Sequence, residues 1–353
     1  MPPHLLVDIS SHGYGHVAQT APVVNELARR HPGLRVTLRC GAPEALLRQR
    51  FDCGFTLIPQ AFDFGMTMAD AVGVKAEESA AAYREFHRDW RQRVAREARA
   101  MEQLAPDLLL ANVPYLSLAA AAEARIPAVA MCSLNWADIY RHYCGGRPEA
   151  AAIHGEMLAA YNSAACFLKL QPGMPMDDLH SARPISPVSH GAADRREEIA
   201  ARLGMKEGEK LAVAAMGGFH LALDMAEWPR LSGVRWAVPA AWEPAHPDAA
   251  TLESLPMPFG DILASCDVLL TKPGYGSFAE AACNGVPVLY LSRPDWPEQP
   301  YLVDWLQRHG RCREISRAQL ERGDLGGSLA ALLAAGRPPA VAATGMGEAA
   351  DVL

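Results

Sequence analysis

The sequence of 353 residues has no apolar run of membrane-spanning length and no long basic run. A membrane-crossing helix needs about 20 mostly apolar residues. A secretory leader needs a basic region followed by an apolar core, whereas this chain opens on a strand-like pattern. We therefore expect a cytoplasmic protein without a transmembrane segment, for which a peripheral membrane contact stays open. The net charge of −7 argues against nucleic acid as a partner.

Motifs for binding metals are also missing. The eight cysteines are scattered, with no C-x-x-C pair and no Cys/His group at zinc spacing, and no D-x-D pair occurs. Isolated cysteines in apolar surroundings are typical of small core residues in a reducing compartment. The sequence predicts no metal site.

The length and the proline-rich stretch at 171–188 predict two domains. Apolar strand-like runs alternate with helical patterns in both halves, which is typical of α/β proteins with parallel sheets. We predict two Rossmann-like domains, 1–187 and 188–353. The last helical piece, 348–353, is a candidate to pack back on the first domain.

Residues 267–306 carry the clearest site pattern. A short apolar run, 268–270, leads into Lys272-Pro-Gly274-Tyr-Gly276-Ser277, and a helical pattern with Glu280 follows. Backbone N–H groups at a helix entrance suit a phosphate. Carboxylates suit sugar or ribose hydroxyls, which makes Glu280 and the later pair Glu298 and Gln299 candidates. Gly217 and Gly218, at another strand end, form a second candidate phosphate turn; the alternative is that these turns serve packing alone.

A second glycine turn follows the first strand, 4–9, as His12-Gly13-Tyr-Gly15-His16. It departs from the dinucleotide fingerprint, because the third glycine is missing and no acidic residue ends the next strand, so nicotinamide binding is disfavoured. A neutral imidazole at a strand's carboxyl end can act as a general base near pH 7. The alternative is that His12 and His16 only bond the loop backbone.

The strand at 128–131 is followed by polar and aromatic residues. Asn135, Trp136 and Asp138 are therefore candidates for the ligand cleft, and Asn135 and Trp136 are candidates for contact with an acceptor. The indole of Trp136 could stack on a sugar, or it could simply pack under the following helix.

The chain resembles glycosyltransferases of the GT-B fold, in which two Rossmann-like domains face each other across a cleft. It is most similar to the glycosyltransferase-like amino-terminal region of arabinokinase-type proteins. More distantly it is similar to the N-acetylglucosamine transferase that completes lipid II and to small-molecule UDP-glycosyltransferases. The resemblance rests on motifs spread over nearly the whole chain: His12–Gly–Tyr–Gly–His16, Asn135–Trp–Ala–Asp138–Ile–Tyr140, Leu170–Gln–Pro–Gly–Met–Pro175 and Lys272–Pro–Gly–Tyr–Gly276 through Glu280.

The resemblance implies roles for single residues. His16 would be the base beside the acceptor, Glu280 would bind the ribose hydroxyls, and Glu298 with Gln299 would recognise the sugar. The sequence departs from the pattern at Asn112, where such families often place the aspartate that partners the base. Asp138 is the nearest substitute.

The leading hypothesis is an inverting, metal-independent glycosyltransferase with a nucleotide-diphosphate sugar, UDP-linked by default, as co-substrate and no bound cofactor. His16, with His12 or Asp138 beside it, would deprotonate a hydroxyl acceptor of unknown identity. Backbone at Gly13, Gly15, Gly217, Gly218, Gly274, Gly276 and Ser277, together with Lys272, would line the binding regions. A non-catalytic sugar-nucleotide sensor is the second hypothesis, favoured by Asn112. A sugar-nucleotide 2-epimerase is the third, and would need acidic groups such as Asp8 and Asp138 in the first domain.

Overall fold

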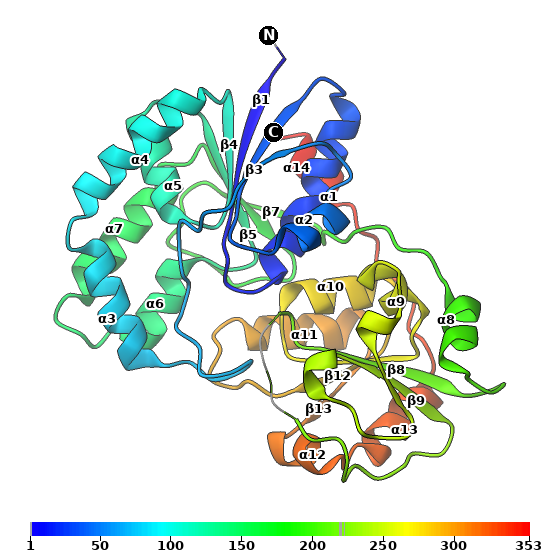
Figure 1. The fold of residues 1–353 in the computed structure, drawn as a ribbon. Helices are drawn as coiled ribbons and strands as arrows, with labels where there is room; N and C mark the ends of the chain where they lie inside the picture. Colours follow the sequence, from blue (N-terminus) through cyan, green and yellow to red (C-terminus); the bar gives the residue numbers. More distant parts are fainter. Residues whose placement is uncertain (1, 219–220, 222) are drawn as a thin grey trace. The chain divides into compact units, whose positions relative to one another are not determined.

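The computed structural model describes residues 2–218, 221 and 223–353, and it divides into two compact α/β units (Figure 1). The first unit comprises the chain up to Ala69, Gly73–Val188 and Thr344–Leu353. The second comprises Asp70–Val72 and Ser189–Ala343. Each is built on one parallel sheet, so the predicted α/β class is confirmed. None of the helices in the described part of the chain combines the length and hydrophobicity that a membrane span requires.

The sheet of the first unit has seven parallel strands in the order β3-β2-β1-β4-β5-β6-β7. Every residue of β1 and β5 is buried, as expected for strands covered by helices on both faces. The strands are β1 (His4–Ile9), β2 (Arg35–Arg39), β3 (Thr56–Ile58), β4 (Leu108–Asn112), β5 (Ala128–Cys132), β6 (Cys166–Leu170) and β7 (Ala182–Ile185).

Strand β7 was not expected, because the sequence pattern predicts 167–170 as the last strand of the first half. The segment was read as irregular because of its prolines. Pro184 lies within β7, but β7 is the edge strand, where a missing backbone N–H can be tolerated.

The helices of the first unit are α1 (Gly15–Arg30), α2 (Glu44–Arg50), α3 (Ala76–His87), α4 (Trp90–Leu104), α5 (Tyr115–Glu123), α6 (Trp136–Cys144), α7 (Ala150–Asn162) and α14 (Gly345–Ala350). The charged pattern at 77–104, with its apolar residues on one face, predicts a single long helix, but the structure has two helices there, α3 and α4. The backbone leaves helical angles at Asp89, with φ −115° and ψ 39°, and α4 starts afresh after it.

Helix α14 belongs to the first unit although it lies near the end of the chain (Figure 1). It lies against α1, where Arg30 Nη1 contacts Asp351 Oδ1 at 2.5 Å. The Glu348 carboxylate accepts a hydrogen bond of 2.9 Å from the Ser186 N–H, just after β7. The segment Thr344–Leu353 thereby completes a unit whose other parts end at Val188.

The sheet of the second unit has six parallel strands in the order β10-β9-β8-β11-β12-β13. Its strands are β8 (Lys210–Ala215), β9 (Val234–Val238), β10 (Ala249–Thr251), β11 (Val268–Thr271), β12 (Val288–Leu291) and β13 (Cys312–Ile315). Its helices are α8 (Arg196–Leu203), α9 (Phe259–Ser265), α10 (Tyr275–Cys283), α11 (Gln299–His309), α12 (Arg317–Arg322) and α13 (Gly326–Ala335), with 3-10 turns η1 (Ala240–Trp242) and η2 (Leu252–Ser254).

Two apolar clusters cover the two faces of this sheet. Neighbouring residues of one strand belong to different clusters: Leu269 packs with Phe278 of α10, whereas Leu270 packs in the cluster that contains Trp236. Since side chains alternate between the faces of a strand, both faces being buried explains the unbroken apolar run at 268–270.

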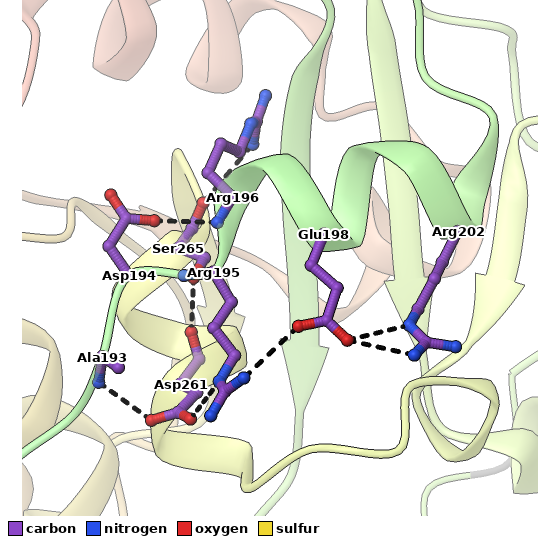
Figure 2. A network of polar contacts seen from close by, with 8 residues as sticks. All are labelled: Ala193, Asp194, Arg195, Arg196, Glu198, Arg202, Asp261 and Ser265. Atoms are coloured by element: carbon purple, nitrogen blue, oxygen red, sulfur yellow. Dashed lines mark hydrogen bonds and ion pairs between the residues drawn. The ribbon is translucent and has the colours of Figure 1, made fainter.

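A polar network fastens the start of the second unit to α9 (Figure 2). The buried Asp261 carboxylate accepts from the Ala193 N–H at 2.9 Å and from Arg195 Nε at 2.7 Å. The Arg195 N–H donates to Ser265 Oγ at 2.7 Å. Glu198 pairs with Arg202 one turn along α8. The network sets the point at which the chain enters α8.

Asp261→Ala is expected to destabilise the second unit by about 1–3 kcal/mol, because it removes hydrogen bonds to a charged acceptor that is itself buried. Urea unfolding, with hydrogen exchange of the α8 amides, measures the loss. Glu198→Ala on the exposed side of the same network is the matched control and should change neither, since exposed ion pairs contribute little. Equal effects of the two variants would contradict the role given to Asp261.

Candidate functional site

The amino-terminal candidate site forms where β1 and β4 end side by side. Ile9, the last residue of β1, pairs with Asn112, the last residue of β4. His16 lies in the first turn of α1, immediately after the glycine loop, and is 5% exposed. Its Nδ1 atom is 2.8 Å from Asn112 Oδ1. The strand register therefore brings together a histidine and an amide that are 96 positions apart in the sequence.

A chain of side-chain amides continues from this pair. Asn112 Nδ2 donates to Gln19 Oε1 at 3.0 Å, and Gln19 Nε2 donates to Ser133 Oγ at 3.0 Å. Gln19 lies three residues after His16 on α1, and Ser133 follows β5. All four side chains are buried. The sequence analysis missed Gln19 and Ser133, although the spacing of three places Gln19 on the same helix face as His16.

The glycine loop itself is shaped for a tight turn. Gly13 has φ 81°, a backbone conformation that favours glycine. Its backbone N–H donates a hydrogen bond to the Ser11 carbonyl oxygen. Gly15 opens α1, and a Cβ atom built on it would meet no atom within 4 Å, so the space beside it is open. These positions are consistent with a loop that a ligand can approach, which stays a prediction.

His12 lies in a different setting from His16. Its ring packs edge-on against Trp136 with 5.1 Å between centroids. The backbone N–H of His12 donates to Ser10 Oγ at 3.3 Å. Trp136 is fully buried, which favours the packing role of its indole over stacking on a sugar. The indole N–H donates to Asp63 Oδ2 at 2.8 Å.

Asp63 is a buried carboxyl group that the sequence did not reveal. Its other oxygen accepts from Ser10 Oγ at 2.9 Å. Burial raises the pKa of Asp63 to about 6, against the opposing effect of the hydrogen bonds from Ser10, Trp136 and the Ser11 backbone. The carboxyl group therefore joins the loop after β1 to the start of α6.

Asn112 itself lies beside His16 Nδ1, and the Asp138 carboxylate has partners on its own helix, so its role as a substitute for the missing aspartate stays a prediction. The Asp138 backbone N–H donates to Asn135 Oδ1 at 2.8 Å, which makes Asn135 the cap of α6. The Asp138 carboxylate accepts from Asn135 Nδ2 at 2.8 Å and pairs with Arg141 at 3.0 Å. Asn135 is buried at this helix start, and its contact with an acceptor stays a prediction.

Asp138, His154 and Asp178 bring atoms capable of binding a metal within 4.8 Å of one another. Arg141 already bridges the two carboxylates, at 3.0 Å and 2.8 Å, and supplies the positive charge they need. Asp8 is likewise ion-paired, with Arg39 Nε at 2.6 Å. Both carboxylates on which the epimerase hypothesis depended are thus engaged by arginines.

The carboxy-terminal candidate site forms at the ends of β8 and β11. Thr271 pairs with Ala215 in the ladder, and its hydroxyl donates to the Ala215 carbonyl at 2.7 Å. The turn after β8 contains Gly217 and Gly218, with φ of 65° and 84°, and the turn after β11 leads through Gly274 into α10. Strand pairing therefore places the two glycine turns next to each other.

Lys272 joins these turns. Its Nζ atom lies 3.9 Å from the point where a Cβ on Gly217 would stand, and 3.8 Å from the equivalent point on Gly274. Burial and the nearby Arg293 together lower the pKa of Lys272 to about 7, against the opposing effect of Glu298. This amine therefore loses its proton far more readily than an ordinary lysine, and it lies beside both glycine turns.

The remaining residues of this region lie on α10 and on the loop before α11. Gly276 and Glu280 of α10 are buried, and Ser277 is half-buried. Glu298 precedes α11, and its Oε2 accepts from Trp296 Nε1 at 3.2 Å. Gln299 Oε1 accepts from the Arg293 N–H at 2.5 Å. Both side chains therefore help to build the loop, and a role in reading a sugar stays a prediction.

Arg293 was not predicted from the sequence. It is 3% exposed, its guanidinium lies 3.8 Å from the centre of the Trp296 ring, and its Nε donates to the Val72 carbonyl at 2.9 Å. Asp70, in the same short segment, pairs with Arg317 at 2.6 Å. Residues Asp70–Val72 are thus part of the second unit's structure, and Ala71 lies in its core.

Two parallel sheets of seven and six strands, each with its glycine turns at the carboxyl ends of the strands, define the GT-B fold of glycosyltransferases. Among solved structures, the glycotransferase of kitacinnamycin matches with a TM-score of 0.60 over 99% of this chain and 98% of its own, at 18% identity. UGT89C1 of Arabidopsis thaliana, complexed with UDP-L-rhamnose, matches with a TM-score of 0.58 over 99% of this chain and 94% of its own, at 16% identity. The predicted GT-B fold is confirmed.

L-arabinokinase of Arabidopsis thaliana is a distant homologue. It is 24% identical over 331 residues, which cover 89% of this chain and 30% of that protein. The chain therefore spans less than a third of this relative, and the shared region is the relative's amino-terminal part, as predicted. No family model matches the chain.

Proposed function

We propose that the protein is a glycosyltransferase that moves a sugar from a nucleotide-diphosphate donor, UDP-linked by default, to a hydroxyl acceptor with inversion and without a metal ion. The observation that carries the proposal is the position of Lys272 between two glycine turns, at the ends of neighbouring strands and at the entrance of α10. Glycine turns with backbone N–H groups, a helix N-terminus and an amine suit a diphosphate.

The donor would bind to the second unit. Its diphosphate would accept hydrogen bonds from the turns at Gly217–Gly218 and Gly276–Ser277, with Lys272 supplying positive charge. Glu280 would accept from the ribose hydroxyls, and Glu298 with Gln299 would face the sugar. The complexes of UGT89C1 with UDP and with UDP-L-rhamnose support UDP as the first nucleotide to test.

The acceptor would bind beside His16. The imidazole would take the proton of the acceptor hydroxyl as its oxygen attacks the anomeric carbon, and the bond from that carbon to the diphosphate oxygen would break. Attack from the face opposite the leaving group inverts the configuration. The charge that develops on the diphosphate would be stabilised by backbone N–H groups and by Lys272.

A sugar-nucleotide sensor is the second candidate. Asn112 is neutral, so it cannot stabilise a protonated His16 as a carboxylate would. This candidate requires nucleotide binding without turnover.

Calorimetric titration with UDP, GDP and dTDP, run beside an assay for hydrolysis of the matching sugar nucleotides, tests both candidates. Glu280→Ala is expected to weaken the binding of the preferred nucleotide by roughly 10- to 100-fold, the equivalent of one or two hydrogen bonds to a charged group. Glu207→Ala, at an exposed position of the second unit, is the control and should leave affinity unchanged.

Binding together with slow donor hydrolysis supports the transferase. Tight binding without hydrolysis supports the sensor. If none of the three nucleotides binds, the glycine turns serve only the fold and the proposal falls.

A further inference from the structure

The hydrogen-bond chain that ends on His16 has a direction. An amide side chain donates only from its nitrogen and accepts only at its oxygen. Gln19 directs its nitrogen at Ser133 Oγ and its oxygen at Asn112 Nδ2. Asn112 therefore presents its oxygen to His16 Nδ1, at 2.8 Å. An oxygen at that position can only accept, and the Cys132 sulfur, 3.7 Å from the same nitrogen, can accept as well, so the histidine nitrogen facing them carries the proton.

We propose that Gln19 is a positioning residue: by holding the Asn112 amide with its oxygen toward His16, it keeps the proton of the neutral imidazole on Nδ1. The lone pair is then on Nε2, the nitrogen that can take up a proton. The inference rests on the proposed function, because it describes how a base is prepared at a site where the usual carboxylate is replaced by an amide. Gln19 acts on His16 through Asn112.

The opposite direction of the chain can be compared with this one. If both amides were turned over, Asn112 would donate to His16 Nδ1, and the ring would carry its proton on Nε2. That arrangement cannot accept a second proton on the ring without breaking the bond to Asn112, because both nitrogens of an imidazolium are donors. The direction with the Asn112 oxygen toward His16 suits both the neutral base and its protonated form.

Histidine-selective ¹⁵N NMR tests the proposal on the full chain, because the two nitrogens of a neutral imidazole differ in chemical shift according to which carries the proton. His16→Gln identifies the His16 signals among the 12 histidines. We expect the Nδ1–H tautomer in the wild-type protein. Gln19→Met, which keeps the length of the side chain without its amide, should shift the signal toward the Nε2–H tautomer and lower kcat about tenfold with the KM for the donor unchanged.

Two further variants separate positioning from a general structural effect. Gln19→Glu keeps an oxygen to accept from Asn112 Nδ2, so it should retain the Nδ1–H tautomer. Asn112→Asp presents an oxygen to His16 however the carboxylate is turned; in that background Gln19→Met should leave the tautomer unchanged. Thermal unfolding checks that each variant is folded. If Gln19→Met is not folded, the test uses the Gln19→Glu and Asn112→Asp variants.

An Nε2–H tautomer in the wild-type protein would overturn the proposal. So would a Gln19→Met variant that is folded and keeps the Nδ1–H tautomer. The NMR readout needs neither donor nor acceptor, so it gives its answer even if the protein proves to have no transferase activity.

Discussion

Exchange of His16 for alanine is expected to lower turnover by about 100-fold or more, while nucleotide affinity stays nearly intact. The imidazole is buried at the end of β1, bonded to Asn112, and belongs to the first unit. The residues proposed to hold the nucleotide all belong to the second unit. Loss of the ring therefore removes a proton acceptor without touching the donor contacts. Single-turnover kinetics with calorimetric measurement of nucleotide affinity separate the two effects.

His12→Ala is the matched comparison. The His12 ring packs against Trp136, whereas His16 forms the hydrogen bond to Asn112. We expect a smaller loss of turnover from His12→Ala. If His12→Ala abolishes turnover and His16→Ala does not, the role of base passes to His12; unchanged turnover in both variants would contradict histidine catalysis altogether.

Nucleotide affinity is expected to fall as the pH rises above 7, by about tenfold for each pH unit. In the free protein the pKa of Lys272 is about 7, lowered chiefly by burial. A bound diphosphate would favour the charged ammonium and raise that pKa. Between the free and the bound pKa, the complex holds one more proton than the free protein. Binding then consumes a proton, and higher pH opposes it; below pH 7 the amine is already charged and this slope disappears.

Calorimetry in buffers of different ionisation enthalpy measures the proton uptake directly. Lys272→Met should weaken binding near pH 7 and abolish both the uptake and the slope. Lys210→Met, at the opposite end of β8 from the glycine turn, is the control and should retain both. A pH-independent affinity in the wild-type protein would show that Lys272 does not face the phosphates.

Much of the fold could be predicted from the sequence because its signals are local. Apolar runs such as 268–270 indicate strands buried on both faces, and glycine turns before helical patterns indicate the carboxyl ends of parallel strands. His16 and Lys272 became candidates because they lie beside such turns. The prediction of one long helix over 77–104 was wrong, because nothing in the charge pattern marks the change of backbone angle at Asp89. Strand β7 was not predicted, because it contains a proline, which within a sheet is tolerated at an edge strand.

The contacts that complete each candidate site were beyond the sequence because they depend on register and on tertiary packing. Asn112 reaches His16 through the pairing of β1 with β4, and Gln19 matters only because Asn112 lies next to it. Asp63 belongs to no recognisable motif, yet it is buried and bonded to both Ser10 and Trp136. Arg293 follows β12 and acquires its partners only when residues Asp70–Val72 pack into the second unit.

The return of α14 to the first unit has a consequence for protein engineering. In chain order, the main part of the second unit, Ser189–Ala343, is an insertion between two parts of the first unit, Gly73–Val188 and Thr344–Leu353, while its segment Asp70–Val72 comes earlier in the chain. A chimaera that exchanges the second unit with that of a relative should therefore be spliced at two points, near 188 and near 343, rather than at one. A single splice would leave α1 facing a foreign α14, without the contacts of Arg30 with Asp351 and of Ser186 with Glu348. Recombination libraries that keep the terminal segment with its own first unit should yield more folded proteins.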